Sequence, residues 1–289
     1  MLAVSGGPDS LALLLMAHQC AAGRITAATI DHQLRPESAD EAAYVGTICQ
    51  QLGIPHVVLT PVRKIAGNIQ SSARAARYEL LANAADARGC ASIATAHHAD
   101  DQLETLLMRL MRGSGIDGLA SIRTRNGTIV RPLLGFSKLE LEEICATAGI
   151  TPVRDPSNDN PDFDRVTVRQ WLAASNHPFQ SARITRTVRA LGDAAEALNW
   201  VADDLSAKHI KHERDVIQCD SANLPHDLKR RLLLRCLSQL EPDLQPRGES
   251  IDRLLVALDA GKTSMIGNIL CRGGINWTFS VAPARHMDR

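Results

Sequence analysis

The chain has 289 residues, and 45% of them are hydrophobic, which is enough to form a folded core and excludes wholesale disorder. Lys and Arg total 32 and Asp and Glu total 32, so the formal net charge is zero. A uniformly basic coat for non-specific nucleic-acid binding is therefore excluded, although a local basic patch is not. The length predicts about two domains.

The sequence also predicts a cytoplasmic location with no membrane attachment. Residues 1–20 lack a basic start and contain Asp9, so we expect no secretory signal. No segment is apolar over the ~20 residues that a membrane-spanning helix needs. The seven cysteines are scattered and never spaced as Cys-x-x-Cys, which indicates reduced thiols and argues against a zinc or iron–sulfur site.

Short β-type runs alternate with helical patterns through the first half of the chain. We expect strands at 2–4, 25–30, 57–59, 92–95 and 129–130, and helices at 11–20, 72–88, 101–112 and 137–148. Ser137 and Glu140 have the spacing of a capping box at the start of the last helix. This alternation predicts an α/β domain with a parallel, Rossmann-like sheet, in which ligands bind beyond the carboxyl ends of the strands.

The second half has few strand-like runs. Its patterns predict helices over roughly 181–216, 222–240 and 249–260, after a turn-rich link at 152–161. We therefore expect two domains, a catalytic domain at 1–170 and a smaller, mainly helical accessory domain at 171–289.

The segment after the first strand is a candidate phosphate-binding loop. It reads Ser5-Gly6-Gly7-Pro8-Asp9-Ser10. The glycines let the backbone turn tightly, and the free N–H groups of the following helix suit phosphate. Asp9 could hold a metal ion beside the phosphates. An ordinary strand-to-helix turn is the competing interpretation. Without the Lys of a Walker A loop, transfer of a γ-phosphate is not expected.

The densest polar cluster runs from His97 to Thr105. Asp101 and Glu104 are three residues apart and share a helix face. Two histidines and two aspartates could form a metal site, while Asp100 could equally be a plain helix cap.

Two further groups are weaker signals. Arg112 and Gly113 fit ordinary capping at a helix end. Arg74 and Arg77 fit a solvated helix face.

Together these strings resemble one family. The loop at 5–10 is similar to the PP-loop of N-type ATP pyrophosphatases, which cleave ATP to AMP and pyrophosphate. Residues 31–38, 97–104, 108–115, 131–134 and 155–158 resemble, in that order, segments of the tRNA(Ile)-lysidine synthetases within that group. The resemblance covers about residues 2–170.

The resemblance implies a two-step ligase reaction that forms a carbon–nitrogen bond. The C2 oxygen of the wobble cytidine in a CAU-anticodon tRNA(Ile) attacks the α-phosphate of ATP and releases pyrophosphate. The ε-amine of free L-lysine then displaces AMP to give lysidine. ATP and Mg²⁺ are the implied cofactors, and a homodimer is left open.

The resemblance also implies site roles. Catalytic roles fall on Asp9, Asp101, Glu104, Arg169 and one of Arg74 or Arg77. Nucleotide contacts fall on Ser5, Gly6, Gly7, Pro8, Asp9, Ser10, Asp31, His32, His97 and Gly113. Substrate contacts fall on Asp101, Glu104, Arg109 and Arg112, and metal contacts on Asp9 and Asp100. Arg169 is favoured over Arg165, because Val166 stands where the family has a polar residue.

Three alternatives remain. A PP-loop enzyme that thiolates tRNA cytidine would need a cysteine pair, and the sequence has no Cys-x-x-Cys. A small-molecule ligase of the GMP or NAD synthetase type lacks support from a glutaminase-like half. A catalytically dead nucleotide sensor is disfavoured by the intact strings at 5–10 and 100–104.

An arginine stripe is the candidate tRNA contact. Residues 165–192 contain five arginines and no acidic residue. Arg183, Arg186 and Arg189 recur every third residue, which on a helix forms a slowly drifting stripe. A solvated face usually mixes both signs of charge, so this pattern favours contact with the phosphate backbone.

Overall fold

The computed structural model describes residues 1–31, 33, 37–61, 69–153 and 164–282, with only the backbone described for residues 69–74 and 164. The chain divides into two compact units, which we call unit 1 (Met1–Gly192) and unit 2 (Asp193–Arg289). The boundary expected after residue 170 lies earlier than this division, inside helix α7 (Asp164–Ala174).

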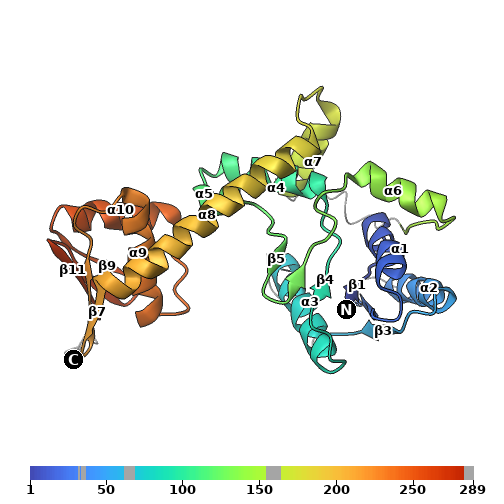
Figure 1. The fold of residues 1–289 in the computed structure, drawn as a ribbon, viewed down its shortest axis with the longest axis horizontal. Coiled ribbons are helices and arrows are strands. Elements are labelled where there is room, and N and C mark those ends of the chain that lie inside the picture. The colour runs from blue at the N-terminus through green and yellow to red at the C-terminus, as the bar shows by residue number, and fades with distance from the viewer. Residues whose placement is uncertain (32, 34–36, 62–68, 154–163, 283–289) are drawn as a thin grey trace, which may run out of the picture. The chain divides into compact units, whose positions relative to one another are not determined.

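Unit 1 is built on a six-stranded sheet (Figure 1). The strands are β1 (Leu2–Ala3), β2 (Ala27–Ile30), β3 (His56–Leu59), β4 (Ile93–Ala94), β5 (Arg125–Asn126) and β6 (Ile129–Val130). Their order is β3-β2-β1-β4-β6-β5, and all neighbours are parallel except the β5–β6 pair. The parallel, Rossmann-like arrangement predicted from the alternating pattern is confirmed.

Helices cover both faces of this sheet. One face packs on α1 (Pro8–Ala21), α2 (Ser38–Gln51) and α6 (Lys138–Thr147), in a core that includes Leu11 and Leu141. The other face packs on α3 (Ile69–Asp86), in a second core around Leu81. Figure 1 shows α3 on the opposite side of the strands from α1 and α2. Successive strand residues point to opposite faces, so Leu2 joins the first core and Met1 the second.

The sheet has a topological switch point between β1 and β4. The chain adds β2 and then β3 on one side of β1, and β4 pairs with β1 on its other side. In open parallel sheets this switch point leaves a crevice at the carboxyl ends of the two strands. The loop at 5–10 and the start of α4 (Ala99–Met111) follow these two strands, so the fold brings them to one place.

Unit 2 combines helices with a second sheet. The long helix α8 (Ser181–His209) contains the division between the units, and α9 (His226–Leu240) and α10 (Gly248–Asp259) follow. The antiparallel sheet has the order β7-β8-β11-β10-β9, formed by Ile210–Glu213, Val216–Asp220, Asn276–Val281, Ile269–Arg272 and Thr263–Ile266. Its core includes Trp277, Phe279 and Leu232, all fully buried.

The helices expected at 222–240 and 249–260 are confirmed as α9 and α10. The helix expected over 181–216 instead ends at His209 and is followed by β7. The five strands of unit 2 were not predicted, although β8 and β11 bury every second residue. Among the described residues, no helix is both long and apolar enough to cross a bilayer.

Candidate active site

The loop at 5–10 forms a tight, internally bonded turn before α1. Gly6 has a φ of +87°, a conformation that favours glycine, and its carbonyl accepts the N–H of Val153 at 2.9 Å. The Ser10 hydroxyl accepts the backbone N–H of Ser5 at 3.1 Å and donates to the Gly7 carbonyl at 2.9 Å. The loop is thereby held with the amino end of α1 facing the crevice, where the first-turn N–H groups have no acceptor within the helix.

Asp9 lies in the first turn of α1. Its Oδ1 is buried without a hydrogen-bond partner in the described structure, and burial raises the pKa of this carboxyl above its usual value. An uncompensated carboxylate oxygen at the end of a phosphate-type loop is an available ligand for a cation.

His98 joins the two halves of the crevice. It is the N-cap residue of α4 and is 4% exposed. Its Nε2 lies 3.7 Å from Asp9 Oδ2 and 3.6 Å from Asp101 Oδ2, while Nδ1 lies 3.5 Å from Asp100 Oδ2. Burial alone would lower the pKa of His98, but these three carboxylates together raise it. The imidazole is therefore favoured in its protonated form.

Asp101 caps α4 by reaching back along the chain. Its Oδ2 accepts the backbone N–H of His98 at 3.0 Å. The capping function that the sequence suggested for Asp100 thus belongs to Asp101, three residues after the N-cap, as in a capping box.

Two arginines of α7 close the other side of the cluster. Arg165 donates from Nη2 to Asp101 Oδ1 at 2.8 Å and from Nε to Glu104 Oε2 at 2.7 Å. Arg169 donates to both oxygens of Glu104, at 2.7 and 3.1 Å. Glu104 is 3% exposed, so its charge is compensated by these two guanidinium groups in place of water.

Arg165 lies in this cluster beside Arg169, although the sequence favours only Arg169 of the two. Val166, whose apolar side chain is the reason for that preference, is buried and so belongs to the packing side of α7. Arg165 and Arg169 are four residues apart, which places both on the face that meets α4. This spacing is the sequence signal that the two arginines share one helix face.

Asp100 is engaged by three different elements. Its Oδ2 accepts the backbone N–H of Lys138 at 2.7 Å, and its Oδ1 accepts the hydroxyl of Ser181. Contact with His98 first, and then these two hydrogen bonds, hold the pKa of Asp100 well below its usual range. Both oxygens accept hydrogen bonds from the protein, and the metal role of Asp100 stays a prediction. In the described ranges no group of three or more His, Cys, Asp or Glu side chains is arranged to hold a metal ion.

Other predicted residues lie at the same edge of the sheet. Asp31 follows β2 and accepts the Ser38 hydroxyl at 2.6 Å, which ties it to the start of α2. His97 follows β4 and shares a hydrogen bond with Thr95 at 2.9 Å. His32 and the segment 155–158 lie outside the described residues, and the side chain of Arg74 is not described.

The end of α4 has the geometry of helix termination. The N–H of Gly113 bonds to the Leu110 carbonyl and that of Ser114 to the Arg109 carbonyl, with Gly113 at φ +63°. This is a Schellman motif, so Gly113 has a structural role and its nucleotide contact stays a prediction. Arg109 and Arg112 are exposed, as are Arg183, Arg186 and Arg189 at the start of α8.

Comparison with known proteins agrees with this geometry. A family model described as the PP-loop domain matches residues 1–175. The tRNA(Ile)-lysidine synthase of Zymomonas mobilis subsp. mobilis is 41% identical to this chain, over 98% of the chain and 88% of that relative. The tRNA(Ile)-lysidine synthase of Novosphingobium aromaticivorans is 38% identical, over 100% of the chain and 90% of that relative.

A solved structure shares the fold at low sequence identity. The U34-tRNA thiolase NcsA from Methanococcus maripaludis matches with a TM-score of 0.55 and 17% identity, covering 66% of this chain and 70% of that one. At this identity the likeness concerns the fold alone.

Proposed function

The chain belongs to the tRNA(Ile)-lysidine synthase family of PP-loop proteins, and from this premise we propose that the crevice between β1 and β4 activates a tRNA cytidine with ATP and then joins lysine to it. The substrate is a tRNA(Ile) with a CAU anticodon. The observation that carries the proposal is the meeting of the loop at 5–10 with the charged cluster of α4 and α7, marked by the 3.7 Å between His98 and Asp9. Because tRNA is the substrate, we place the reaction in the cytoplasm.

In the first step, the C2 oxygen of the wobble cytidine attacks the α-phosphate of ATP and pyrophosphate leaves. The loop at 5–10 and the amino end of α1 bind the leaving pyrophosphate through backbone N–H groups and the positive end of the helix dipole. Protonated His98, close to this loop, adds positive charge where negative charge develops.

Asp9 fits a Mg²⁺ ion, because its buried Oδ1 has no partner in the described structure. Mg²⁺ typically uses one or two protein carboxylates and completes its shell with phosphate oxygens and water, so a lone carboxylate beside a phosphate loop suffices. When bound, the ion would neutralise part of the charge on the phosphates.

In the second step, the ε-amine of lysine attacks C2 of the adenylated cytidine, AMP leaves, and the amine loses a proton. The contacts favour different roles for the two carboxylates that the family resemblance pairs. Glu104 has both oxygens occupied by Arg165 and Arg169, so we assign it to orienting those guanidinium groups toward the adenylate phosphate. Asp101 accepts only one hydrogen bond on each oxygen, from Arg165 and from the His98 N–H, and its side chain is 13% exposed against 4% for Glu104, so we assign Asp101 to the lysine amine.

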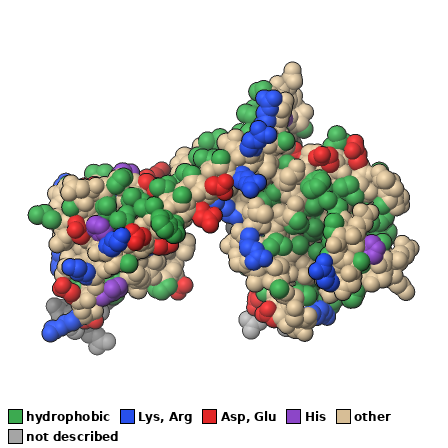
Figure 2. Space-filling view, viewed as in Figure 1, with side chains coloured by type: hydrophobic (Ala, Val, Ile, Leu, Met, Phe, Trp, Pro, Cys, Tyr) green, Lys and Arg blue, Asp and Glu red, His purple; other side chains and the backbone are tan. Residues whose placement is uncertain are grey.

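Contact with the tRNA backbone is assigned to exposed arginines. The stripe Arg183, Arg186 and Arg189 lies on the part of α8 that belongs to unit 1. Figure 2 shows acidic, basic and hydrophobic side chains interspersed on the visible face of unit 2. The acid-free start of α8 is therefore the stronger candidate for phosphate contact.

Cytidine thiolation is the competing tRNA modification. It is disfavoured because five of the seven cysteines are buried and none is spaced as Cys-x-x-Cys. The two that are not buried, Cys20 and Cys90, lie at the carboxyl ends of α1 and just after α3, away from the phosphate loop in the sequence of elements.

The test is direct. The protein is incubated with ATP, Mg²⁺, labelled lysine and a tRNA(Ile) transcript, beside a transcript that carries uridine at the wobble position. We expect label in the first transcript only, with one AMP and one pyrophosphate released per lysine. Pyrophosphate release without tRNA, or label from a sulfur donor in place of lysine, would contradict the proposal.

A further inference from the structure

Asp100 connects the amino end of α4 to the amino end of α8. Ser181, the first residue of α8, donates its hydroxyl to Asp100 Oδ1, and the other Asp100 oxygen contacts His98 at 3.5 Å. Ser181 and Asp100 are 81 positions apart in the chain. A single carboxylate thus joins the helix that carries the arginine stripe to the histidine of the crevice.

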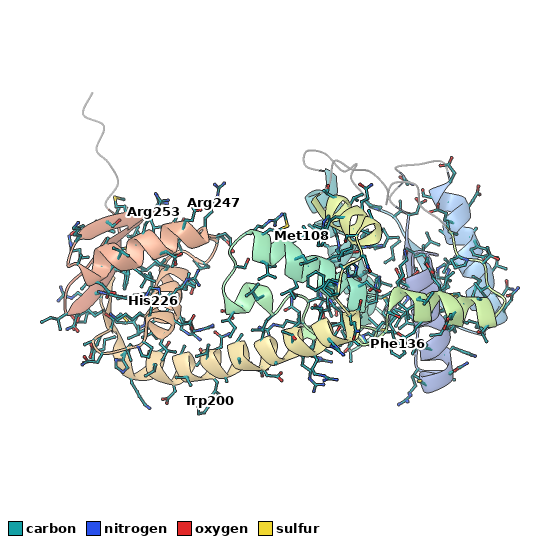
Figure 3. The ribbon with its side chains drawn as sticks, turned by 90° about the horizontal axis from the view of Figure 1, so that it is seen from above. Met108, Phe136, Trp200, His226, Arg247 and Arg253 are labelled. Carbon is teal, nitrogen blue, oxygen red and sulfur yellow. The ribbon has the colours of Figure 1, made fainter. Side chains whose placement is uncertain are left out.

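The segment 134–138 also connects the starts of α4 and α8 through hydrogen bonds. The carbonyl of Phe136, labelled in Figure 3, accepts the N–H of Ala99 at 2.8 Å, and the N–H of Lys138 donates to Asp100 at 2.7 Å. The Leu134 carbonyl accepts the hydroxyl of Thr185, one turn further along α8, at 3.3 Å. The first turns of α8 are therefore fixed to the same loop as the start of α4.

The arginine stripe starts directly after this junction. Arg183 to Arg189 lie within ~12 Å of Ser181 along the helix axis, at 1.5 Å per residue. All three arginines are exposed, while Val188 between them is buried. A phosphate backbone bound to the stripe is therefore held at a set distance from Asp100 and His98.

We propose that Ser181 is a positioning residue, which through Asp100 holds the tRNA-binding helix in register with the ATP site. This inference rests on the proposed function. Hydrogen bonds from non-reacting groups commonly fix reacting groups to within a fraction of an ångström, and a small misplacement is costly to the rate. The role requires no contact between Ser181 and either substrate, so loss of Ser181 should slow the reaction without weakening binding.

The test compares Ser181→Ala with Ser181→Thr and with Thr185→Val. Thr185→Val removes a neighbouring hydroxyl that bonds to the same loop but not to Asp100. We expect Ser181→Ala to lower kcat for lysine incorporation about tenfold, the effect of one hydrogen bond to a charged group. The KM for tRNA and the affinity for ATP should change less than about twofold, because the arginines and the phosphate loop are intact. Ser181→Thr should regain most of the rate, and Thr185→Val should stay close to wild type.

A double variant tests the route through Asp100. If Ser181 acts through Asp100, the double variant Ser181→Ala with Asp100→Ala, in which the acceptor is removed, should be no slower than Asp100→Ala alone. An additive loss, an unchanged kcat in Ser181→Ala, or an equal loss in Thr185→Val would overturn the inference. A wild-type protein that does not incorporate lysine would instead overturn the proposed function, so the two failures are distinguishable.

Discussion

Arg165 Nε donates to Glu104 Oε2 at 2.7 Å, although the two residues are 61 positions apart in the chain. Arg169 donates to the other Glu104 oxygen, Oε1, at 2.7 Å and also to Oε2 at 3.1 Å. An almost fully buried carboxylate under two half-exposed guanidinium groups is a device for holding the arginines, because the outward N–H groups of each fork stay available. This relationship separates the role of Glu104 from that of Asp101.

The first prediction concerns Glu104→Gln. A glutamine accepts through one oxygen only and carries no charge, so at least one arginine loses its partner. We expect the rate of adenylate formation to fall by about 10–100-fold, corresponding to ~1.5–3 kcal/mol for hydrogen bonds to charged groups. The KM for lysine should stay near wild type. Pyrophosphate release and lysine incorporation, measured over a lysine titration, separate the two quantities.

Asp101→Asn should give the opposite pattern, with a raised KM for lysine. Glu140→Gln, at the exposed capping box of α6, changes a carboxylate outside the site and serves as the control. If Glu104→Gln raises the KM for lysine and leaves adenylation intact, Glu104 binds the lysine amine after all.

The second prediction concerns Asp9→Asn. The burial of an unpartnered carboxylate oxygen destabilises the folded state, so its neutralisation should raise the Tm of the ligand-free protein, by about 2 °C for each ~0.5–1 kcal/mol recovered. Pyrophosphate release should fall by ~100-fold or more, the scale of losing one transition-state electrostatic group.

Asp40→Asn is the control for Asp9→Asn. Asp40 is exposed in the first turn of α2, where its charge favours the helix dipole, so its loss should lower the Tm slightly and spare the activity. A lower Tm in Asp9→Asn, or wild-type pyrophosphate release, contradicts the assignment of Asp9.

The third prediction concerns the pH dependence of stability through Asp100. Contact with His98 and hydrogen bonds from Ser181 and the Lys138 N–H lower its pKa in the folded protein below the ordinary value of 3.8. A carboxylate with a lowered pKa stabilises the fold at pH values above its ordinary pKa, and this contribution is lost as the pH falls through the lowered value.

Asp100→Asn should therefore lower the free energy of unfolding by ~1–2 kcal/mol at neutral pH, the loss of hydrogen bonds to a charged acceptor that is partly exposed. The difference from wild type should narrow as the pH falls below about 4. Urea denaturation at a series of pH values measures the difference in free energy of unfolding between Asp100→Asn and wild type. A gap of constant size down to the acid limit would show that the carboxylate charge is not involved.

The sequence predicts that the loop at 5–10 and the start of α4 lie together, because local patterns of strand, turn and helix are enough to place both. A glycine-rich turn between a β-type run and a helix places the loop at 5–10, and the parallel sheet brings it next to the start of α4. The partners of Glu104 could not be read in the same way, since Arg165 and Arg169 reach it only through the packing of α7 on α4. Side-chain pairing between distant elements follows from tertiary packing.

Unit 2 shows a different limit. The alternation of Ile217 and Cys219 in β8, and of Trp277 and Phe279 in β11, is a period-two pattern that predicts half-buried strands. The Ala, Leu and Arg content of the region favours helices more strongly, because short strands give a weak signal beside long helices. His209, the last residue of α8, is followed directly by β7 without a glycine or proline to mark the change.

The last prediction concerns the arginine stripe. Arg183, Arg186 and Arg189 are exposed on α8, in a stretch from 165 to 192 that has no acidic residue. Aromatic residues are only 3% of the chain, so base stacking is a poor candidate for the main contact with RNA. Binding through the phosphate backbone releases counterions, so the affinity should fall steeply as salt rises.

Replacing all three arginines by Gln should weaken tRNA binding and reduce the slope of log K against log salt by about 2 to 3, near one for each lost phosphate contact. The affinity for ATP should not change. A control variant replaces Arg24, Arg88 and Lys211 by Gln, which removes the same charge from three exposed positions outside α8. Because non-specific charge loss is equal in the two variants, only a specific phosphate contact gives a different salt slope. Equal slopes for both variants and wild type would show that the stripe faces solvent without touching the tRNA.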